Sequence, residues 1–194
     1  MRRLIVTQNA TVDGAVEMLD PWFDPTDQDP ELAAELRRQD ETNDALVLGR
    51  QTFEDFRGYW PQQTDDTTGV AEQLDRVHKY VVSSTLDDPG WVNSTVLRGD
   101  PVEEVGRLKD GPGQDIVCTG SITLAHALIT AGLVDEFRVF TFPAVQGRGR
   151  RFFPDRYAVA GLTTADVRRF DNGVVYTAWA RRDGASGDDR APAG

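Results

Sequence analysis

The chain has 194 residues, with 32 acidic residues against 21 lysines and arginines and a formal net charge of −11. This length supports one domain with a substantial core, and we predict a single domain over residues 1–182 followed by a disordered polar tail over 183–194. The acidic balance argues against a nucleic-acid partner, and no segment approaches the roughly 18 consecutive apolar residues of a membrane span.

Strand and helix signals alternate along the chain. A β-rich run over residues 2–8 comes first, and a proline-rich loop over 19–30 follows it. Asp29 and Pro30 are typical of a helix start, because aspartate caps the first turn and proline suits the first helical position. Asp100 and Pro101 repeat that signal. Further helices are predicted over 51–57, 67–77, 101–108 and 121–131, and further strands over 45–48, 80–82, 91–97, 115–119 and 136–142.

The end of the chain has a different pattern. Two alternating segments flank Asn172-Gly173, a pair that favours a tight turn, so we predict a β-hairpin there. Alternating strands and helices followed by a hairpin indicate an α/β fold, with a mostly parallel sheet and antiparallel strands at one edge.

Three strand ends carry candidate site residues. Gly49, Arg50 and Thr52 follow the strand at 45–48, Ser83 and Ser84 follow the strand at 80–82, and Gly120 and Ser121 follow the strand at 115–119. Glycine lets a ligand approach the backbone closely, a helix start presents free N–H groups, and arginine and hydroxyl side chains donate to phosphate. Each segment alone is also compatible with an ordinary polar turn or helix cap. Lys79 lies near the second segment in sequence, and the basic loop 147–151 is a further candidate phosphate clamp.

Charge is distributed unevenly along the chain. Residues 13–44 hold eleven acids and two arginines, whereas residues 137–182 hold nine arginines and three acids. We expect the acidic segment to border the mouth of the site and the arginines, with Arg50 and Lys79, to favour an anionic ligand. A carboxylate among Asp13, Glu17 and Glu35 could anchor a substrate or donate a proton.

Other chemistries find little support. A single cysteine excludes a disulfide framework and suggests the cytoplasm, and with only two histidines we predict no metal site. Cys118 lies in an apolar strand and is predicted to be buried. Neither His78 nor His126 belongs to a catalytic triad motif. Four aromatic residues could form a wall for a planar heterocycle or could equally be core residues: Trp22, Phe23, Tyr59 and Trp60.

The order of these segments resembles the dihydrofolate reductase-like superfamily. The segments LVLGRQTFEDFRGYWP, KYVVSSTL and IVCTGSITLAHALITAGLVDEF, followed by the run to Phe153, look most like the reductase domain of the bacterial riboflavin-biosynthesis deaminase-reductase and its stand-alone relatives. The resemblance covers about residues 1–181. It implies a mostly parallel sheet of about eight strands, NADPH as hydride donor, a small-molecule substrate and a homodimer.

The resemblance also assigns residues. It implies that the cofactor contacts a set drawn from the three strand ends: Gly49, Arg50, Thr52, Ser83, Ser84, Gly120, Ser121, Ile122 and Leu124. Asp13, within Thr11-Val12-Asp13-Gly14, is the candidate proton donor.

The sequence departs from the resembled enzymes in two respects. The zinc-binding residues of the deaminase are absent, and the loop after the first strand is long, acidic and rich in proline. The leading hypothesis is therefore an NADPH-dependent reductase of a small pterin- or pyrimidine-like heterocycle. The alternatives are a non-catalytic nucleotide- or ligand-binding protein on the same fold and a dimeric interaction module.

Overall fold

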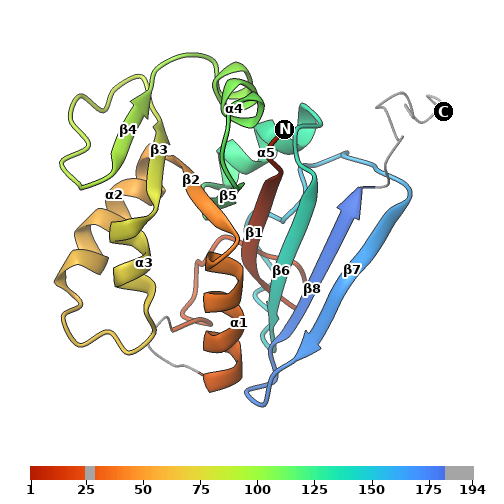
Figure 1. Cartoon of the computed structure of the whole chain (residues 1–194). Helices are drawn as coiled ribbons and strands as arrows, with labels where there is room; N and C mark the ends of the chain where they lie inside the picture. Colours follow the sequence, from red (N-terminus) through yellow and green to blue (C-terminus); the bar gives the residue numbers. More distant parts are fainter. Residues whose placement is uncertain (25–28, 182–194) are drawn as a thin grey trace.

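The computed structural model describes residues 1–24 and 29–181, so the tail predicted over 183–194 lies outside the described residues. The strands of this part form one sheet in the order β4-β3-β2-β5-β1-β6-β8-β7 (Figure 1). They are β1 (Leu4–Thr11), β2 (Asn43–Gly49), β3 (His78–Val82), β4 (Ser94–Leu97), β5 (Asp115–Thr119), β6 (Glu136–Phe142), β7 (Leu162–Arg169) and β8 (Val175–Arg181).

Strand direction confirms the predicted fold class. Neighbouring strands from β4 to β6 are parallel, and β8 pairs antiparallel with both β6 and β7. The central strands β1, β2 and β5 have apolar side chains buried on both faces, as a parallel sheet covered on both sides requires.

Helices cover both faces of the sheet. They are α1 (Pro30–Asp40), α2 (Arg50–Tyr59), α3 (Val70–Arg76), α4 (Pro101–Asp110) and α5 (Ile122–Thr130), with a short 3-10 helix η1 (Trp60–Gln62). Side chains from α2 and α3 pack against one face and those from α1 against the same face near β6 and β8, while α4 and α5 pack against the other. None of these helices is long and apolar enough to cross a membrane.

The two predicted Asp-Pro helix starts are confirmed. One carboxylate oxygen of Asp29 accepts from the N–H groups of Glu31 and Leu32 at 2.9 and 3.0 Å. Asp100 caps α4 in the same way. Each carboxylate satisfies two N–H groups that have no partner within the helix, which fixes where α1 and α4 begin.

The predicted hairpin is also confirmed, with a longer turn. Gly173 has a φ of +85°, whereas Asn172 is not among the residues with positive φ. The N–H of Gly173 donates to the carbonyl of Phe170, and the N–H of Phe170 donates to the carbonyl of Val174. The turn is therefore a three-residue loop with glycine in the left-handed position.

Candidate functional site

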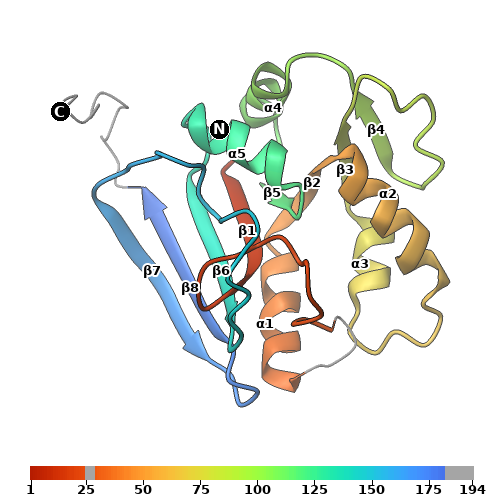
Figure 2. The same cartoon turned by 180° about the vertical axis from the view of Figure 1, so that it is seen from behind.

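A cleft of about 390 Å³ opens at the carboxyl ends of β2 and β5. Figure 2 shows the helices that begin there, α2 and α5, together with the loops that follow β1 and β6. Parallel strands commonly bind ligands at this edge, because the backbone turns there into helix N-termini. The cleft is lined by Val16, Glu17, Met18, Gly49, Arg50, Gln51, Thr52, Asp55, Gly120, Ser121, Ile122, Thr123, Leu124 and Arg150.

The first wall is the junction between β2 and α2. Gly49 occupies the N-cap position and has no side chain to cap the helix, so the first turn of α2 presents backbone N–H groups. Arg50 is the first residue of the helix. Its guanidinium is half exposed and lies 3.4 Å from Glu54, at the outer limit of a hydrogen bond.

The second wall is the junction between β5 and α5. Two consecutive residues there adopt the left-handed conformation, Gly120 with a φ of +57° and Ser121 with a φ of +41°. The left-handed conformation is unfavourable for a residue other than glycine, so contacts with the surrounding structure must hold Ser121 in it. The side-chain amide of Gln8, from the neighbouring strand β1, donates to the carbonyl of Gly120 and stabilises this turn.

Two reciprocal hydrogen bonds join these junctions. The hydroxyl of Ser121 accepts from the N–H of Gly49, and the hydroxyl of Thr52 accepts from the N–H of Ser121, each at 2.8 Å. The sequence predicts a hydroxyl cap at the start of α5, but Ser121 makes no capping bond because its oxygen faces Gly49 instead. Each hydroxyl accepts one bond and keeps its own O–H free to donate to a ligand.

The second predicted strand end does not reach the cleft. Ser83 is buried, and its hydroxyl accepts from the N–H groups of Thr85 and Leu86, which closes its own turn. Ser84 is exposed beside it. Neither serine lines the cleft.

Lys79 does not supply charge to an anion site, and that expectation is wrong. Its side chain is fully buried at the start of β3. The ammonium donates to the carbonyls of Leu74 and Val77 and lies 4.6 Å from the ring centre of Trp91. Burial lowers the pKa of Lys79 to about 8.

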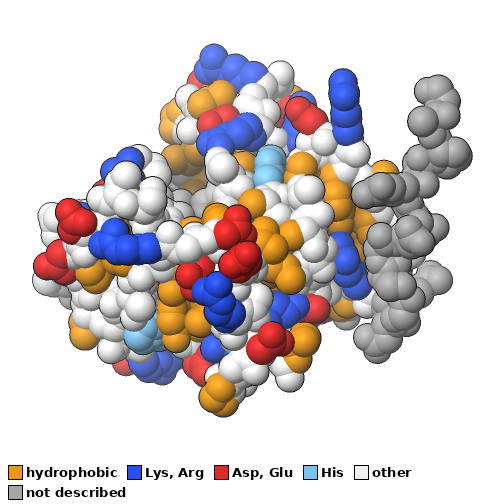
Figure 3. Space-filling model, turned by 90° about the horizontal axis from the view of Figure 1, so that it is seen from above, with side chains coloured by type: hydrophobic (Ala, Val, Ile, Leu, Met, Phe, Trp, Pro, Cys, Tyr) orange, Lys and Arg blue, Asp and Glu red, His pale blue; other side chains and the backbone are white. Residues whose placement is uncertain are grey.

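Some acidic and basic residues of the two segments form ion pairs with each other. The loop after β1 and the loop after β6 lie side by side, and a β-bridge joins Ala15 to Arg151. Three ion pairs cross between the loops: Glu17 with Arg150 at 2.8 Å, Asp20 with Arg148 at 3.0 Å, and Asp13 with Arg151 at 3.7 Å. Charges of opposite sign are therefore paired between these two loops, and Figure 3 shows acidic and basic side chains interspersed over the face seen from above.

Gln146 holds the same two loops together. Its side-chain oxygen accepts from the N–H groups of Leu19 and Asp20 and from the indole N–H of Trp22. Its side-chain nitrogen donates to the carbonyl of Glu17 at 2.8 Å. Sequence reasoning missed this residue because a lone glutamine carries no signal until two distant loops meet around it.

Asp13 also holds the loops. Its carboxylate accepts from the hydroxyl of Thr11 at 2.5 Å and from the N–H groups of Gln146 and Gly147 at 3.2 and 2.8 Å. These bonds lower the pKa of Asp13 to about 2. A carboxylate that is ionised and held by three donors is poorly suited to releasing a proton, and Asp13 does not line the cleft.

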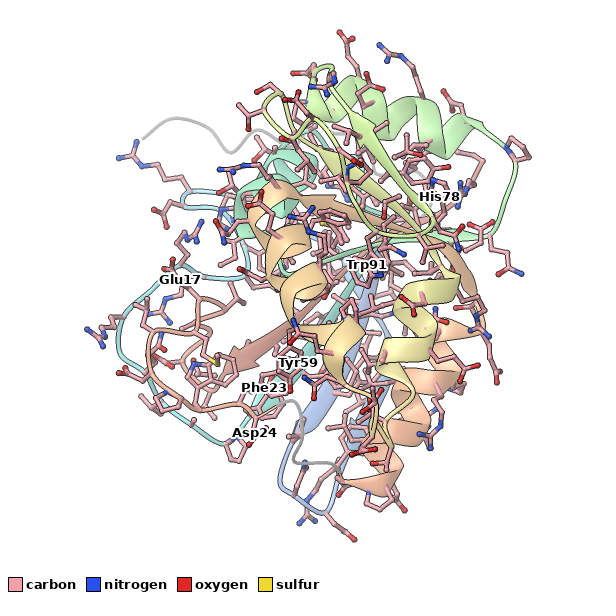
Figure 4. The ribbon with its side chains drawn as sticks, turned by 90° about the vertical axis from the view of Figure 1, so that its left-hand side faces the viewer. Glu17, Phe23, Asp24, Tyr59, His78 and Trp91 are labelled. Carbon is pink, nitrogen blue, oxygen red and sulfur yellow. The ribbon has the colours of Figure 1, made fainter. Side chains whose placement is uncertain are left out.

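The other two candidate carboxylates have partners as well. Glu17 lies on the loop after β1 (Figure 4), and its contact with Arg150 holds the pKa of Glu17 below its usual range. Glu35 lies on α1, and its almost fully buried side chain forms ion pairs with Arg38 at 2.6 Å and with Arg168 at 3.1 Å. Glu35 therefore belongs to the packing of α1 against the sheet and is absent from the cleft lining.

The four candidate aromatics form two separate groups. Trp22 and Phe23 pack against Phe142 with ring centres 5.6 and 5.1 Å apart. Tyr59 and Trp60 pack edge to face at 5.1 Å. Figure 4 shows Phe23 on the loop after β1 and Tyr59 at the end of α2, so the two groups come from different elements.

Seven of the nine predicted cofactor-binding residues therefore line one cleft, and Ser83 and Ser84 do not. The cleft adds residues that the sequence did not single out as ligands, chiefly Arg150 and Thr123. Arg150 had a signal, because it lies in the basic loop 147–151, but the sequence does not show which arginine of that loop faces the cleft.

Comparison with known proteins identifies relatives of this chain. The profile of the RibD C-terminal domain family matches residues 2–176. The chain is 34% identical over 179 residues to YyaP, an uncharacterized protein of Bacillus subtilis strain 168, with 90% of this chain and 92% of YyaP covered.

Solved structures share the fold. A protein of Shewanella sp. PV-4 with an inferred role in riboflavin biosynthesis matches with a TM-score of 0.69 at 18% identity, over 93% of this chain and 99% of its own. A pyrimidine reductase-like protein of Corynebacterium diphtheriae matches with a TM-score of 0.63 at 16% identity, over 94% and 93%. RibD of Acinetobacter baumannii matches with a TM-score of 0.62 at 15% identity, and this chain, 94% covered, spans 58% of its length. The chain thus belongs to the RibD C-terminal domain family.

Proposed function

We propose that the chain is a nicotinamide-dependent reductase that uses NADPH to reduce a small pterin- or pyrimidine-like heterocycle. The observation that carries the proposal is the convergence of two helix N-termini without capping side chains, two hydroxyls and two arginines on one cleft. Membership of the RibD C-terminal domain family supports a reductase, and the pyrimidine reductase-like relative supports a heterocyclic substrate.

The cleft has the chemistry that a phosphate-rich cofactor requires. Helix N-termini and arginine guanidiniums favour anions, and the hydroxyls of Thr52 and Ser121 have free protons to donate. A Cβ atom added to Gly49 would lie 3.7 Å from the side chain of Ser121, which is ordinary contact. The protein itself therefore tolerates a side chain at Gly49, and the lack of one leaves the backbone there open to close approach by a ligand.

The residues of the chain would bind and orient the cofactor and the substrate, and a bound reduced nicotinamide would supply the hydride, with solvent water as the source of the proton. Arg50 and the first turns of α2 and α5 hold phosphate groups. The loop after β1 contributes Val16, Glu17 and Met18 to the opposite wall of the cleft. Asp13 keeps that loop in place, so we assign it no proton transfer.

Cofactor binding is the first test. Titration with NADPH and with NADH, followed by nucleotide fluorescence, should show binding of NADPH at micromolar to submillimolar concentrations. Arg50→Ala should weaken NADPH more than NADH, because arginine pairs strongly with a phosphate and NADH lacks the 2′-phosphate. An equal loss for both nucleotides would show that Arg50 does not meet that phosphate.

Turnover is the second test. Pterins, pyrimidines and flavin precursors are offered as substrates, and oxidation of NADPH is followed by absorbance. Binding without oxidation of NADPH across this set would favour the non-catalytic nucleotide-binding alternative. Failure to bind either nucleotide at millimolar concentration would refute the reductase proposal itself.

A further inference from the structure

The charged groups that line the cleft cancel one another. Glu17 and Asp55 contribute two negative charges, and Arg50 and Arg150 contribute two positive charges. A cofactor with several phosphate charges therefore meets a wall without net charge. An arginine that exchanged its carboxylate partner for a phosphate group would make this wall a better site for that cofactor.

Arg150 is the arginine that is most fully engaged. Its Nε and one terminal nitrogen donate to Oε1 of Glu17 at 3.1 and 2.8 Å, and its backbone N–H donates to Oε2 at 3.2 Å. Its other terminal nitrogen donates to the hydroxyl of Thr123 at 3.1 Å. Thr123 is in the first turn of α5, so this bond already holds the guanidinium beside the uncapped helix N-terminus.

We propose that Arg150 is a phosphate-binding residue that Glu17 holds in reserve, and that a phosphate group of the cofactor displaces the carboxylate of Glu17 from the guanidinium. The inference rests on the proposed function, because it requires a phosphate-bearing ligand in this cleft. Glu17 acts as an internal anion that competes with the ligand. The bond to Thr123 keeps Arg150 directed toward the cleft whichever anion it meets.

The exchange is favourable on chemical grounds. A phosphate offers more acceptor oxygens to the guanidinium than one carboxylate does, and it can be held at the same time by the N–H groups of α5. Glu17 is partly exposed, so its released carboxylate can be solvated by water. The backbone of the loop keeps its other anchors on Gln146.

The same loops supply matched controls. Arg148 pairs with Asp20 across the same two loops at 3.0 Å, but neither residue lines the cleft. Replacing this pair removes an inter-loop ion pair of the same kind without touching the cleft. Any effect that comes only from loosening the loops should therefore appear equally in Arg148→Met and Asp20→Asn.

The experiment is a double-mutant cycle on NADPH affinity, measured by titration calorimetry and nucleotide fluorescence. We expect Arg150→Met to weaken NADPH by about tenfold or more, the range of a charge-assisted hydrogen bond, and Glu17→Gln to tighten it by about three- to tenfold, the range of one ordinary hydrogen bond. In the Arg150→Met background, Glu17→Gln should have no further effect. Arg148→Met and Asp20→Asn should stay within about twofold of wild type.

Several outcomes would overturn the proposal. Unchanged affinity in Arg150→Met, weaker binding in Glu17→Gln, or effects of the two changes that simply add would each contradict the exchange. If wild type binds NADPH and Arg50→Ala weakens it while Arg150→Met does not, the exchange fails and the reductase proposal stands. If wild type binds neither NADPH nor NADH, both fail together.

Discussion

Replacing Gly120 with alanine tests the turn that forms one wall of the cleft. Gly120 lies between β5 and α5 with a φ of +57°, a conformation that side-chain residues rarely adopt. A Cβ atom there would lie 2.7 Å from the Cγ2 methyl of Thr52 and 3.2 Å from its hydroxyl oxygen. Because that hydroxyl accepts from the N–H of Ser121, the methyl cannot move away without disturbing the bond between the two junctions.

The expected cost follows from these two effects. Left-handed backbone costs a side-chain residue about 1–2 kcal/mol. Displacing Thr52 weakens a partly buried hydrogen bond, at a cost of about 1–2 kcal/mol. The free energy of unfolding should therefore fall by about 2–4 kcal/mol, which for a chain of this length lowers Tm by about 5–15 °C.

Chemical denaturation followed by far-UV circular dichroism measures this change, and two further variants separate its causes. Thr52→Ser removes the crowding methyl and keeps the hydroxyl, so Gly120→Ala should cost less in a Thr52→Ser background. Gly49→Ala should cost under about 1 kcal/mol, because φ there is −76° and the new Cβ makes only ordinary contact. A Gly120→Ala protein within about 0.5 kcal/mol of wild type, or no relief from Thr52→Ser, would refute the reasoning.

Three other results are expected. Cys118 should not react with thiol reagents until the protein is unfolded, because burial raises the pKa of its thiol to about 12. Lys79→Met should lower stability by about 1–3 kcal/mol in thermal unfolding, since the carbonyls of Leu74 and Val77 lose their donor at a buried position. Asp13→Asn should be less stable than wild type at neutral pH, and the gap should close as pH falls from 3.8 toward about 2, because the folded state lowers the pKa of Asp13.

The parts of the fold that the sequence predicts are those set by local chemistry. Asp29 and Asp100 each precede a proline and cap a helix, because the cap and the helix start lie within three residues of each other. Gly49 and Gly120 come together because parallel strands end at one edge of a sheet, whatever lies between them in the sequence. Seven cofactor candidates therefore line the cleft although none belongs to a long motif.

The features that the sequence does not predict depend on contacts between distant segments. Ser121 resembles a helix cap in the sequence. Its hydroxyl instead accepts a hydrogen bond from the N–H of Gly49, which lies beside it only when β2 and β5 are paired. Lys79 looks like a surface cation, yet the end of α3 and the ring of Trp91 enclose it. The bond of Ser121 cannot be read from neighbouring residues, because Gly49 belongs to another element. The carbonyls that hold Lys79 lie only two and five residues before it, but its burial also depends on Trp91, which is distant in sequence.

The net charge of −11 is a similar case, because the field in the cleft depends on which charges pair. Residues 13–44 are strongly acidic, but three of their carboxylates pair with arginines of the loop 147–151. A cleft whose charges cancel exerts little attraction on a distant anion, since opposite charges in contact leave only a short-range field. Affinity for a phosphate-bearing ligand must then come from hydrogen bonds formed on contact, to the first turns of α2 and α5, the two hydroxyls and whichever arginine exchanges its partner. Because the chain as a whole is negative and the charges of the cleft cancel, raising the salt concentration should leave the rate of NADPH association nearly unchanged or raise it slightly, and a steep fall in that rate would show that long-range attraction to the cleft exists after all.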